Sequence, residues 1–595
     1  MNKLKRVQTA ILMLAILAGS IYTGSRTAVG ASPEKANPKI ADRQASSAGA
    51  QPAPAQSAPW WQRAVFYEIY PRSFADSNGD GIGDINGITS KLDYLKDLGV
   101  DALWITPCFP SPQVDFGYDV SDYQDIAPEF GTIADFDRLL AQAKKRNIKI
   151  LLDLVVNHTS NKHKWFVDSA SSRDNPKRDW YVWRDGRNGG PPNNWQSLFG
   201  HSAWKFSPNT KQYYYHFFYP EQPDLNWRNK QVRKAMYDMV RFWLDRGVAG
   251  FRLDAVSTVF EDPNLKDNPL LVGKNKFGDP NMQNKYNYRL PENHEILKEL
   301  RTVVNAYPDD RVLLGETCTD NVSELWKMYG ANNDEVQLPM NFFFAYVNKL
   351  SANEFAKRIL EADRNPLKGW PVYLFSNHDT PRHYVRYGDG KSNNQIAKLM
   401  ATMLLTLRGT PILYYGEEIG MENRDPKTRQ EVQDPIGKIG WPKEKGRDGE
   451  RTPMQWTSGK NAGFSSASAT WLPVANNYKT HNVESELEDP QSILNWYRKV
   501  ISLRRSHPAF LGGDYVPVGN NGNNVLSYLR RSAKRSVLIA MNMSNAPQKL
   551  SLDTKGLGIK SGNSKILAAT FDARERQPLS KTNLPPFSAL IAEVE

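Results

Sequence analysis

The chain has 595 residues, of which 40% are hydrophobic and 11% aromatic, so it can bury large cores and is not a disordered protein. Its 76 basic and 64 acidic residues leave a net charge of +12 without a long basic run, which argues against a nucleic-acid-binding protein. Two cysteines exclude a disulfide scaffold and a thiolate zinc site. We expect Cys108 and Cys318 to be buried free thiols, although the sequence leaves their pairing open.

The N-terminal residues predict an export signal rather than a folded element. A basic start is followed by an apolar stretch over residues 10–21 and by small residues up to Ala31, which is typical of a secretory signal peptide at 1–31. Residues 32–59 are rich in Ala, Pro, Ser and Gln and predict a disordered linker. We therefore expect an exported protein, periplasmic or secreted, without a stable membrane span once processed. An uncleaved membrane anchor is the alternative.

An acidic, glycine-rich loop follows at residues 76–84. Oxygen-bearing side chains stand at every second position, as in the front half of an EF-hand loop, but Gly87 occupies the twelfth position, where an EF-hand has glutamate. The loop predicts one structural Ca²⁺ or Mg²⁺, and the alternative is a solvated turn. The predicted ligands are Asp76, Asn78, Asp80, Asp84 and the carbonyl of Ile82.

From residue 60 onward, short apolar runs alternate with amphipathic helical patterns. Buried strands are expected at 64–70, 102–106, 148–156, 250–255, 312–316, 372–375 and 412–415. This alternation, with about eight repeats, predicts an α/β fold: a (β/α)₈ TIM barrel over 60–158 and 226–514. A polar, aromatic segment after the third strand predicts an inserted domain at 159–225. The short strands of residues 515–595 predict a C-terminal antiparallel β-sandwich.

Charged groups and imidazoles follow four of the expected strands. They are Asp153 to His158, then Arg252 with Asp254, then Glu316, and last His378 with Asp379. Active sites of such barrels lie at the carboxyl ends of the strands, so we expect three acids, Asp254, Glu316 and Asp379, to converge on one cleft. Two or three carboxylates without a transition metal suit the cleavage of glycosidic bonds. The sequence has no nucleophile elbow, phosphate-binding glycine loop or HExxH motif.

The spacing of these residues suggests separate roles for them. Arg252 stands two residues before Asp254, on the same face of a strand, where its cation would keep Asp254 ionised as a nucleophile. Glu316, expected to be shielded from such a cation, would keep a raised pKa and serve as the acid. His158 and His378 can donate hydrogen bonds to sugar hydroxyls.

These motifs, in this order, resemble those of glycoside hydrolase family 13, the α-amylase superfamily, and of its α-glucosidase and oligo-1,6-glucosidase branch. The resemblance runs from residue 60 to the end of the chain. It implies that Asp254 is the nucleophile, Glu316 the acid/base and Asp379 the stabiliser of the transition state. It also implies a metal in the loop at 76–84. The residues that it assigns to binding the non-reducing sugar and closing its pocket are Asp115, Tyr118 and Arg451.

The activity implied by the resemblance is that of a retaining, exo-acting α-glucosidase. Its substrates would be small α-glucosides: maltose, malto- or isomalto-oligosaccharides and, as a further candidate, sucrose. The segment 222–226 favours the exo-acting branch, and the small Ala255 after the nucleophile favours α-1,4 linkages, because a branched side chain would narrow the leaving-group site. Cationic Arg382 and Arg386 leave a sucrose isomerase or another transglucosylase as the alternative. A non-catalytic, amylase-like binding protein is a more distant one.

Overall fold

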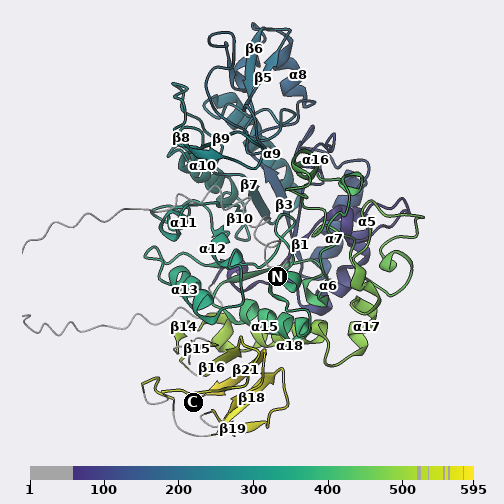
Figure 1. The fold of residues 1–595 in the computed structure, drawn as a ribbon, viewed down its shortest axis with the longest axis vertical. Coiled ribbons are helices and arrows are strands. Elements are labelled where there is room, and N and C mark those ends of the chain that lie inside the picture. Colours follow the sequence, from purple (N-terminus) through teal and green to yellow (C-terminus); the bar gives the residue numbers. More distant parts are fainter. Residues whose placement is uncertain are drawn as a thin grey trace, which may run out of the picture.

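The computed structural model describes residues 58–518, 524–533, 535–553, 556–559, 563–579 and 582–594 (Figure 1). The signal peptide predicted at 1–31 lies outside the described residues, as does the linker predicted at 32–59 except for its last two positions. Within the described part of the chain, no helix has the length and apolarity needed to span a membrane.

Eight short parallel strands form one sheet in the order β11-β10-β7-β3-β2-β1-β13-β12. They are β1 (Phe66–Ile69), β2 (Ala102–Ile105), β3 (Lys149–Val155), β7 (Gly250–Asp254), β10 (Val312–Gly315), β11 (Leu338–Pro339), β12 (Val372–Tyr373) and β13 (Thr410–Tyr414). Because β1 pairs with both β2 and β13, the last strand returns to the first and the sheet curls into a nearly closed barrel. This confirms the predicted barrel.

The barrel strands are buried on both faces, and their two-residue period decides which side chains point inward. On β2, Trp104 joins an apolar cluster with Phe66 of β1 and Leu151 of β3, whereas Leu103 joins the larger cluster formed with the surrounding helices. The same alternation turns polar residues inward near the carboxyl ends of the strands: Glu68 on β1, Asp153 on β3, and Arg252 and Asp254 on β7.

Amphipathic helices surround the barrel (Figure 1). The longer ones are α7 (Ile133–Lys145), α9 (Lys230–Arg246), α10 (Asn293–Asn305), α13 (Ala352–Asp363), α15 (Asn393–Thr406) and α18 (Ile493–Ser506), and shorter ones include α6 (Leu92–Leu98), α16 (Pro435–Gly440) and α17 (Val483–Glu488). Helix α7 illustrates how they form: Thr132 and Asp135 make a reciprocal capping box, and the buried face is Phe136, Leu139 and Ala143.

The segment between β3 and α9 forms a separate lobe at the top of Figure 1. It contains helix α8 (Lys164–Ser171) and a three-stranded sheet of β4 (Trp183–Arg184), β6 (Gln212–Tyr215) and β5 (Trp204–Ser207). Its core is aromatic and includes Trp195, Trp204 and Tyr215. After β7 comes a hairpin of β8 (Leu270–Lys274) and β9 (Pro280–Met282), whose first strand is exposed throughout.

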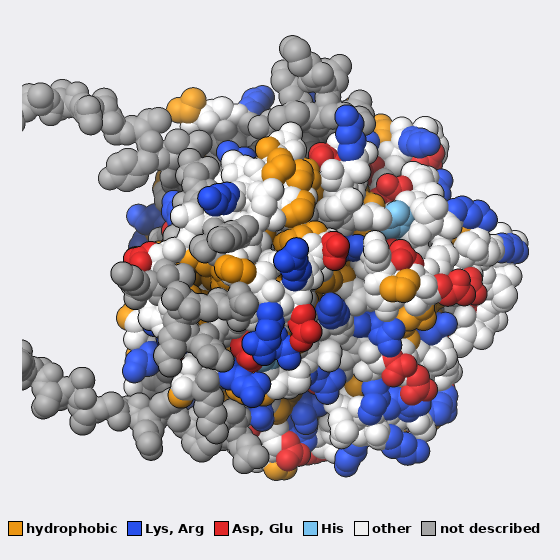
Figure 2. All heavy atoms as spheres, turned by 90° about the horizontal axis from the view of Figure 1, so that it is seen from below, with side chains coloured by type: hydrophobic (Ala, Val, Ile, Leu, Met, Phe, Trp, Pro, Cys, Tyr) orange, Lys and Arg blue, Asp and Glu red, His pale blue; other side chains and the backbone are white. Residues whose placement is uncertain are grey.

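The C-terminal residues form an antiparallel sheet in the order β14-β15-β16-β21-β18-β19. These strands are β14 (Asp514–Pro517), β15 (Val525–Arg531), β16 (Ser536–Asn542), β21 (Ser588–Val594), β18 (Asn563–Ala569) and β19 (Arg576–Pro578); a second layer is only β17 (Gln548–Lys549) and β20 (Asn583–Leu584). On β16, Ile539 packs toward the barrel helices and Leu538 toward the second layer. Seen from this end, Lys and Arg side chains lie among Asp and Glu side chains (Figure 2).

Candidate active site

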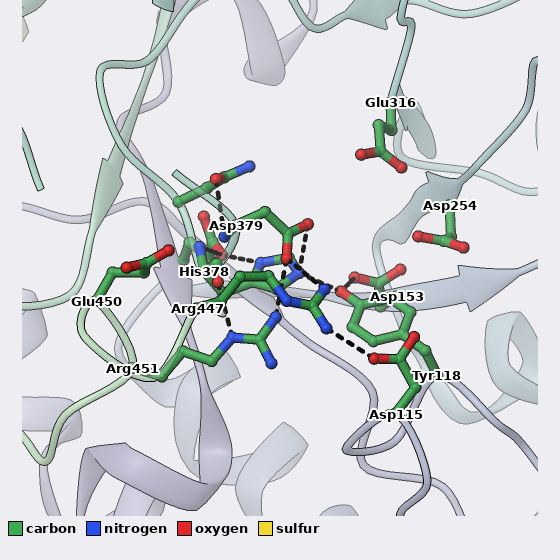
Figure 3. Close-up of polar contacts among 12 residues, drawn as sticks. Asp115, Tyr118, Asp153, Asp254, Glu316, His378, Asp379, Arg447, Glu450 and Arg451 are labelled. Carbon is green, nitrogen blue, oxygen red and sulfur yellow. Dashed lines mark hydrogen bonds and ion pairs between the residues drawn. The ribbon is translucent and has the colours of Figure 1, made fainter. Parts of the chain in front are cut away.

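One guanidinium group holds the acidic residues at the carboxyl ends of the neighbouring strands β3, β7 and β10. Arg252 Nη1 lies 2.9 Å from Asp153 Oδ1 and 2.8 Å from Asp254 Oδ1, and its Nη2 lies 3.0 Å from Glu316 Oε2. The backbone N–H of Ala255 also donates to Glu316 Oε2, at 3.0 Å. Figure 3 shows Asp254 and Glu316 projecting from adjacent strands beside Asp153. The structure therefore brings the predicted nucleophile and acid/base together around one cation.

This arrangement corrects the expectation that Glu316 is shielded from a cation, because Arg252 contacts both acids. Burial raises the pKa of Asp254 well above its ordinary value; Arg252 opposes this, while Glu316 and Asp153 add to it. Three carboxyl groups around one guanidinium cannot all ionise at low cost. Arg252 therefore offsets only part of the cost of burying an ionised Asp254.

Asp379, which follows β12, stands between two arginines. Its Oδ1 accepts hydrogen bonds from Arg447 Nη1 at 2.9 Å and from Arg451 Nη2 at 2.8 Å. Burial alone would raise the pKa of Asp379, but the neighbouring His378 ring and the positive charges of Arg447 and Arg451 outweigh it and hold that pKa below the ordinary value. Asp379 is therefore the acid in this pocket that stays ionised.

Arg447 is the residue that sequence reasoning missed. Its Nη2 donates to Asp115 Oδ1 at 2.8 Å, so it ties the loop after β2 to Asp379 and to its own loop, where Asp434 Oδ2 accepts from its Nε at 2.8 Å. Arg451, which was assigned the role of closing the pocket, is 1% exposed and donates from Nε to the carbonyl of His378 at 2.7 Å. In the structure Arg447 contacts Asp115, whereas Arg451 contacts Asp379. A second arginine four positions before Arg451 was the available signal.

The aromatic and imidazole residues complete the pocket floor. Tyr118 Oη lies 3.1 Å from Asp153 Oδ2 and 2.6 Å from His378 Nε2. His158 has its Nε2 3.1 Å from the carbonyl of Tyr118 and 3.1 Å from Gln222 Nε2, and burial lowers its pKa to about 3. His158 is thus a neutral ring whose Nε2 is occupied by protein groups. Both ring nitrogens of His378 also have protein partners, Glu68 at Nδ1 and Tyr118 at Nε2.

Asp115 is held from two directions. Besides Arg447, Gln222 Nε2 donates to its Oδ2 at 3.3 Å. Burial, partly offset by Arg447, raises the pKa of Asp115 to about 6. Gln222 lies in the segment 222–226 that the sequence singled out, and the structure places this segment at the base of the inserted lobe, beside His158.

The loop at 76–84 has an oxygen donor set of the kind that Ca²⁺ and Mg²⁺ take, with carboxylate, amide and carbonyl groups. Asp76 Oδ1 accepts the backbone N–H of Gly79 at 2.7 Å, and Asp80 Oδ1 accepts that of Ile82 at 2.7 Å. Asp84 Oδ1 caps a helix by accepting from Gly87 N. Among the described residues, no three His, Cys, Asp or Glu side chains cluster as metal ligands. The donor chemistry fits a hard cation, and the metal stays a prediction.

Both cysteines are free, as expected: Cys108 is buried and Cys318 half-buried. The described chain thus has an acid-lined pocket at the carboxyl ends of barrel strands, with two acids on one guanidinium and a third, ionised acid nearby. This combination defines a class, the carboxylate-dependent glycoside-cleaving barrels.

Comparison with known proteins gives the family. The alpha-amylase catalytic domain matches residues 68–513, so the chain belongs to the α-amylase family and is a glycoside hydrolase. It is 43% identical to a probable alpha-glucosidase of Rhizobium meliloti, over 84% of this chain and 92% of that protein. It is 40% identical to an oligo-1,6-glucosidase of Parageobacillus thermoglucosidasius, over 90% and 99%.

A solved structure extends the comparison. An isomaltulose synthase mutant from Erwinia rhapontici NX5, in complex with its natural substrate sucrose, superposes with a TM-score of 0.83 at 36% identity, over 91% of this chain and all of that one. The fold is therefore shared by enzymes whose names denote different reactions, so the fold alone does not determine the reaction of this chain.

Proposed function

We propose that this protein is a retaining, exo-acting α-glucosidase that releases α-glucose from the non-reducing end of short α-glucosides. The observation that carries the proposal is the pairing of Asp254 and Glu316 on Arg252, opposite an ionised Asp379. The first step of a retaining reaction requires a nucleophile and an acid side by side, and these two carboxyl groups contact the same guanidinium group.

In the proposed reaction, Asp254 attacks the anomeric carbon while Glu316 gives its proton to the glycosidic oxygen. The covalent glucosyl intermediate is then hydrolysed by a water that Glu316, now a base, deprotonates. Arg252 balances the negative charge that moves between the two acids. Ionised Asp379 would bind the 2- and 3-hydroxyls of the glucose and favour the positive charge that develops on the ring.

Exo-action is supported by the contacts that close the far end of the pocket. The pair between Asp115 and Arg447 spans it. Beyond that pair, Phe199 and Tyr219 of the inserted lobe pack on Ile436 of α16. In the proposed function, these contacts block a chain that continues past its terminal glucose, so that only a chain end reaches Asp254.

The proposed preference for α-1,4 linkages rests on Ala255. This residue has a φ of +48°, in the left-handed region that β-branched residues avoid, and its N–H holds Glu316. A valine here would add strain as well as bulk beside the acid that protonates the leaving group. The small side chain keeps room for a secondary leaving-group hydroxyl.

Sucrose isomerisation is the second candidate, favoured by the isomaltulose synthase as a structural neighbour. Two cations that left this alternative open contribute little to it. Arg382 is buried and donates to the carbonyls of Tyr415 and Glu450, and Arg386 donates to those of Ala345 and Phe375. Both guanidinium groups are thus held by backbone carbonyl groups.

The deciding experiment is product analysis by chromatography with maltose, isomaltose and sucrose offered separately. Glucose released mainly from maltose, and no product from the Asp254→Asn variant, is the expected result. Isomaltulose or trehalulose formed from sucrose with little free glucose would overturn hydrolysis in favour of isomerisation. No turnover of any glucoside by folded protein would favour a binding role.

We also propose one structural Ca²⁺ or Mg²⁺ in the loop at 76–84, and export through the signal at 1–31. Metal analysis of purified protein, with and without a chelator, tests the first: a bound ion whose loss lowers the melting temperature is expected, and absence of any bound ion contradicts it. N-terminal sequencing of protein recovered outside the cytoplasm tests the second.

A further inference from the structure

Glu68 is a buried acid near the pocket to which the proposed reaction gives no role. It lies on the inner face of β1 and is 0% exposed. Its Oε1 is 2.7 Å from His378 Nδ1 and accepts the backbone N–H of His378 at 3.2 Å. Its Oε2 is buried and makes no hydrogen bond with any described residue. An ionised carboxylate with one oxygen that makes no hydrogen bond would be costly in a barrel interior, which favours the protonated form of Glu68.

The ring of His378 is fixed between aromatic neighbours. It stacks on Tyr118 with centroids 5.4 Å apart and on Tyr70 at 6.1 Å, and Trp104 lies edge-on at 5.9 Å. With its plane held, the ring presents Nδ1 to Glu68. Its Nε2 faces the pocket, 2.6 Å from Tyr118 Oη and 3.3 Å from Asp379 Oδ2.

The groups around Nε2 indicate that it carries a proton. Asp379 is ionised, so a lone pair on Nε2 would face a carboxylate oxygen at 3.3 Å, whereas an N–H would be attracted to it. The single proton of Tyr118 Oη can go to Asp153 Oδ2 at 3.1 Å, which leaves an oxygen lone pair for Nε2–H. Nε2 is therefore a donor.

The contact between His378 Nδ1 and Glu68 Oε1 holds a proton that belongs to one of the two groups. Burial lowers the pKa of His378; Asp379 opposes this, and Arg451 and Arg252 add to it, so the ring is neutral. A neutral ring with a proton on Nε2 has a lone pair on Nδ1. The 2.7 Å contact then requires the proton to be on Glu68. Burial also raises the pKa of Glu68 well above its ordinary value, and a neutral acid tolerates a bare carbonyl oxygen better than an anion does.

We propose that Glu68 is a positioning residue that stays a carboxylic acid and donates its O–H to His378 Nδ1, so that His378 Nε2 stays a donor, shared between Tyr118 Oη and a hydroxyl of the bound glucose. The inference rests on the proposed function for the identity of that ligand. The hydrogen-bond direction at His378 does not depend on it. Glu68 touches no substrate and acts only through His378.

Other titratable and charged groups face this pair from every side of the barrel. They are Tyr70, Tyr118, Asp153, Arg252, Asp379, Tyr414, Arg447 and Arg451. If Glu68 lost its proton, His378 would carry its own proton on Nδ1, and Nε2 would change from a hydrogen-bond donor to an acceptor.

Two substitutions separate positioning from mere packing. In Glu68→Gln the side-chain amide can still donate to Nδ1, so kcat/KM should stay within about 3-fold of wild type. In Glu68→Met the donor is lost, Nδ1–H becomes the favoured tautomer, and kcat should fall about 10- to 100-fold with little change in KM, the loss expected for one transition-state donor. The alkaline limb of the pH profile should move upward in Glu68→Gln, because an amide cannot ionise.

Glu418 supplies a matched control. It is also a fully buried acid on the barrel, but its Oε1 accepts from the hydroxyls of Tyr67 and Tyr94. Glu418→Gln and Glu418→Met should lower the melting temperature without moving the pH profile. Equal loss of kcat in Glu68→Gln and Glu68→Met would overturn the proposal.

The tautomer can be read directly by ¹⁵N NMR of protein labelled in its 9 histidines, with His378→Asn used to assign the signal. Wild type and Glu68→Gln should show a protonated Nε2 and a bare Nδ1 at His378. A protonated Nδ1 in wild type would overturn the proposal even if Glu68→Met fails to fold. Because this readout needs no turnover, it stands if the protein proves to cleave no glucoside.

Discussion

Buried arginines serve opposite purposes at the two ends of the barrel. In the pocket, Arg252 and Arg447 contact carboxylates, and those charges raise their pKa values although burial alone would lower them. Beneath the barrel, Arg504 of α18 and Arg530 of β15 are also buried, but they donate hydrogen bonds to backbone carbonyl oxygens. Burial there lowers their pKa values to about 10 and about 9.

The arginines in the pocket take part in the reaction, whereas those beneath the barrel stabilise the fold. A guanidinium among carboxylates decides which acid holds a proton, so its neighbours belong to the reaction. A guanidinium among carbonyls satisfies the backbone where α15 ends and ties it to the C-terminal sheet, so its neighbours belong to stability. Changes in the first set should alter kinetics with little loss of fold, and changes in the second should do the reverse.

The largest effect is expected at the centre of the pocket. Asp254→Asn should lower kcat by about four orders of magnitude, because no nucleophile remains. The melting temperature should hold or rise, because the substitution removes one of the carboxyl groups that crowd Arg252. Steady-state kinetics and thermal unfolding measure the two effects. Retained turnover would remove Asp254 from its assigned role.

A smaller effect is expected where the pocket is closed. Arg447→Met leaves Asp115, Asp379 and Asp434 without their shared cation, and kcat/KM should fall about 100-fold, mainly through KM. The matched control is Arg408→Met, which breaks a pair with Asp363 outside the pocket and should change kcat/KM little. If both variants behave alike, the closing role of Arg447 fails.

At the other end, Arg530→Met should cost about 2–4 kcal/mol of unfolding free energy, because the carbonyls of Phe510, Gly513 and Thr406 lose a donor in a buried interface. Denaturant unfolding measures it, and kcat/KM should not change. The adjacent, exposed Arg531 is the control, and Arg531→Met should cost well under 1 kcal/mol. A kinetic defect in Arg530→Met would break the division between the two regions.

The smallest effect is a pH dependence outside the pocket. Burial raises the pKa of Glu486 on α17 to about 7, above the pKa of glutamate in the unfolded chain. The protonated form of Glu486 therefore stabilises the fold fully below about pH 4.5, and this stabilisation is lost as the pH rises through 7. Glu486→Gln, whose amide oxygen can still accept from Leu494 N, should gain about 1–3 kcal/mol on wild type between pH 5 and pH 8.

Unfolding curves at several pH values check this difference. The exposed neighbour Glu488 gives the control, and Glu488→Gln should follow wild type at every pH. A constant offset between Glu486→Gln and wild type would show that packing, and not ionisation, is responsible.

The sequence predicted the helices and strands whose apolar residues recur at a regular spacing. Apolar runs and helical patterns located seven of the eight barrel strands, the inserted lobe and the C-terminal sheet. Strand β11 was missed because it has only two residues, Leu338 and Pro339, and the second is a proline, which sequence reasoning does not favour in a central strand. Its place is given by pairing with β10.

The site was predictable where a strand end carries the residue, and not where contacts decide its role. Asp254, Glu316 and Asp379 stand at strand ends, so the barrel itself brings them together. Arg252 on β7 contacts Glu316, which follows the neighbouring strand β10, as well as Asp254. This contact depends on the conformation of a long side chain, which the sequence does not specify. The role of Arg447 depends on the path of a long loop, which no periodic pattern records.

The left-handed backbone at Ala255 limits how this enzyme can diverge. Any replacement there changes the room beside the leaving group, the strain of the turn and the direction of the N–H that holds Glu316, all at once. A substitution of Ala255 is therefore tolerated only together with changes in the residues around Glu316. A lineage that exchanges one glucosidic linkage for another through this residue should carry a companion substitution near Glu316, so that linkage preference is inherited as a set of residues and not as a single one.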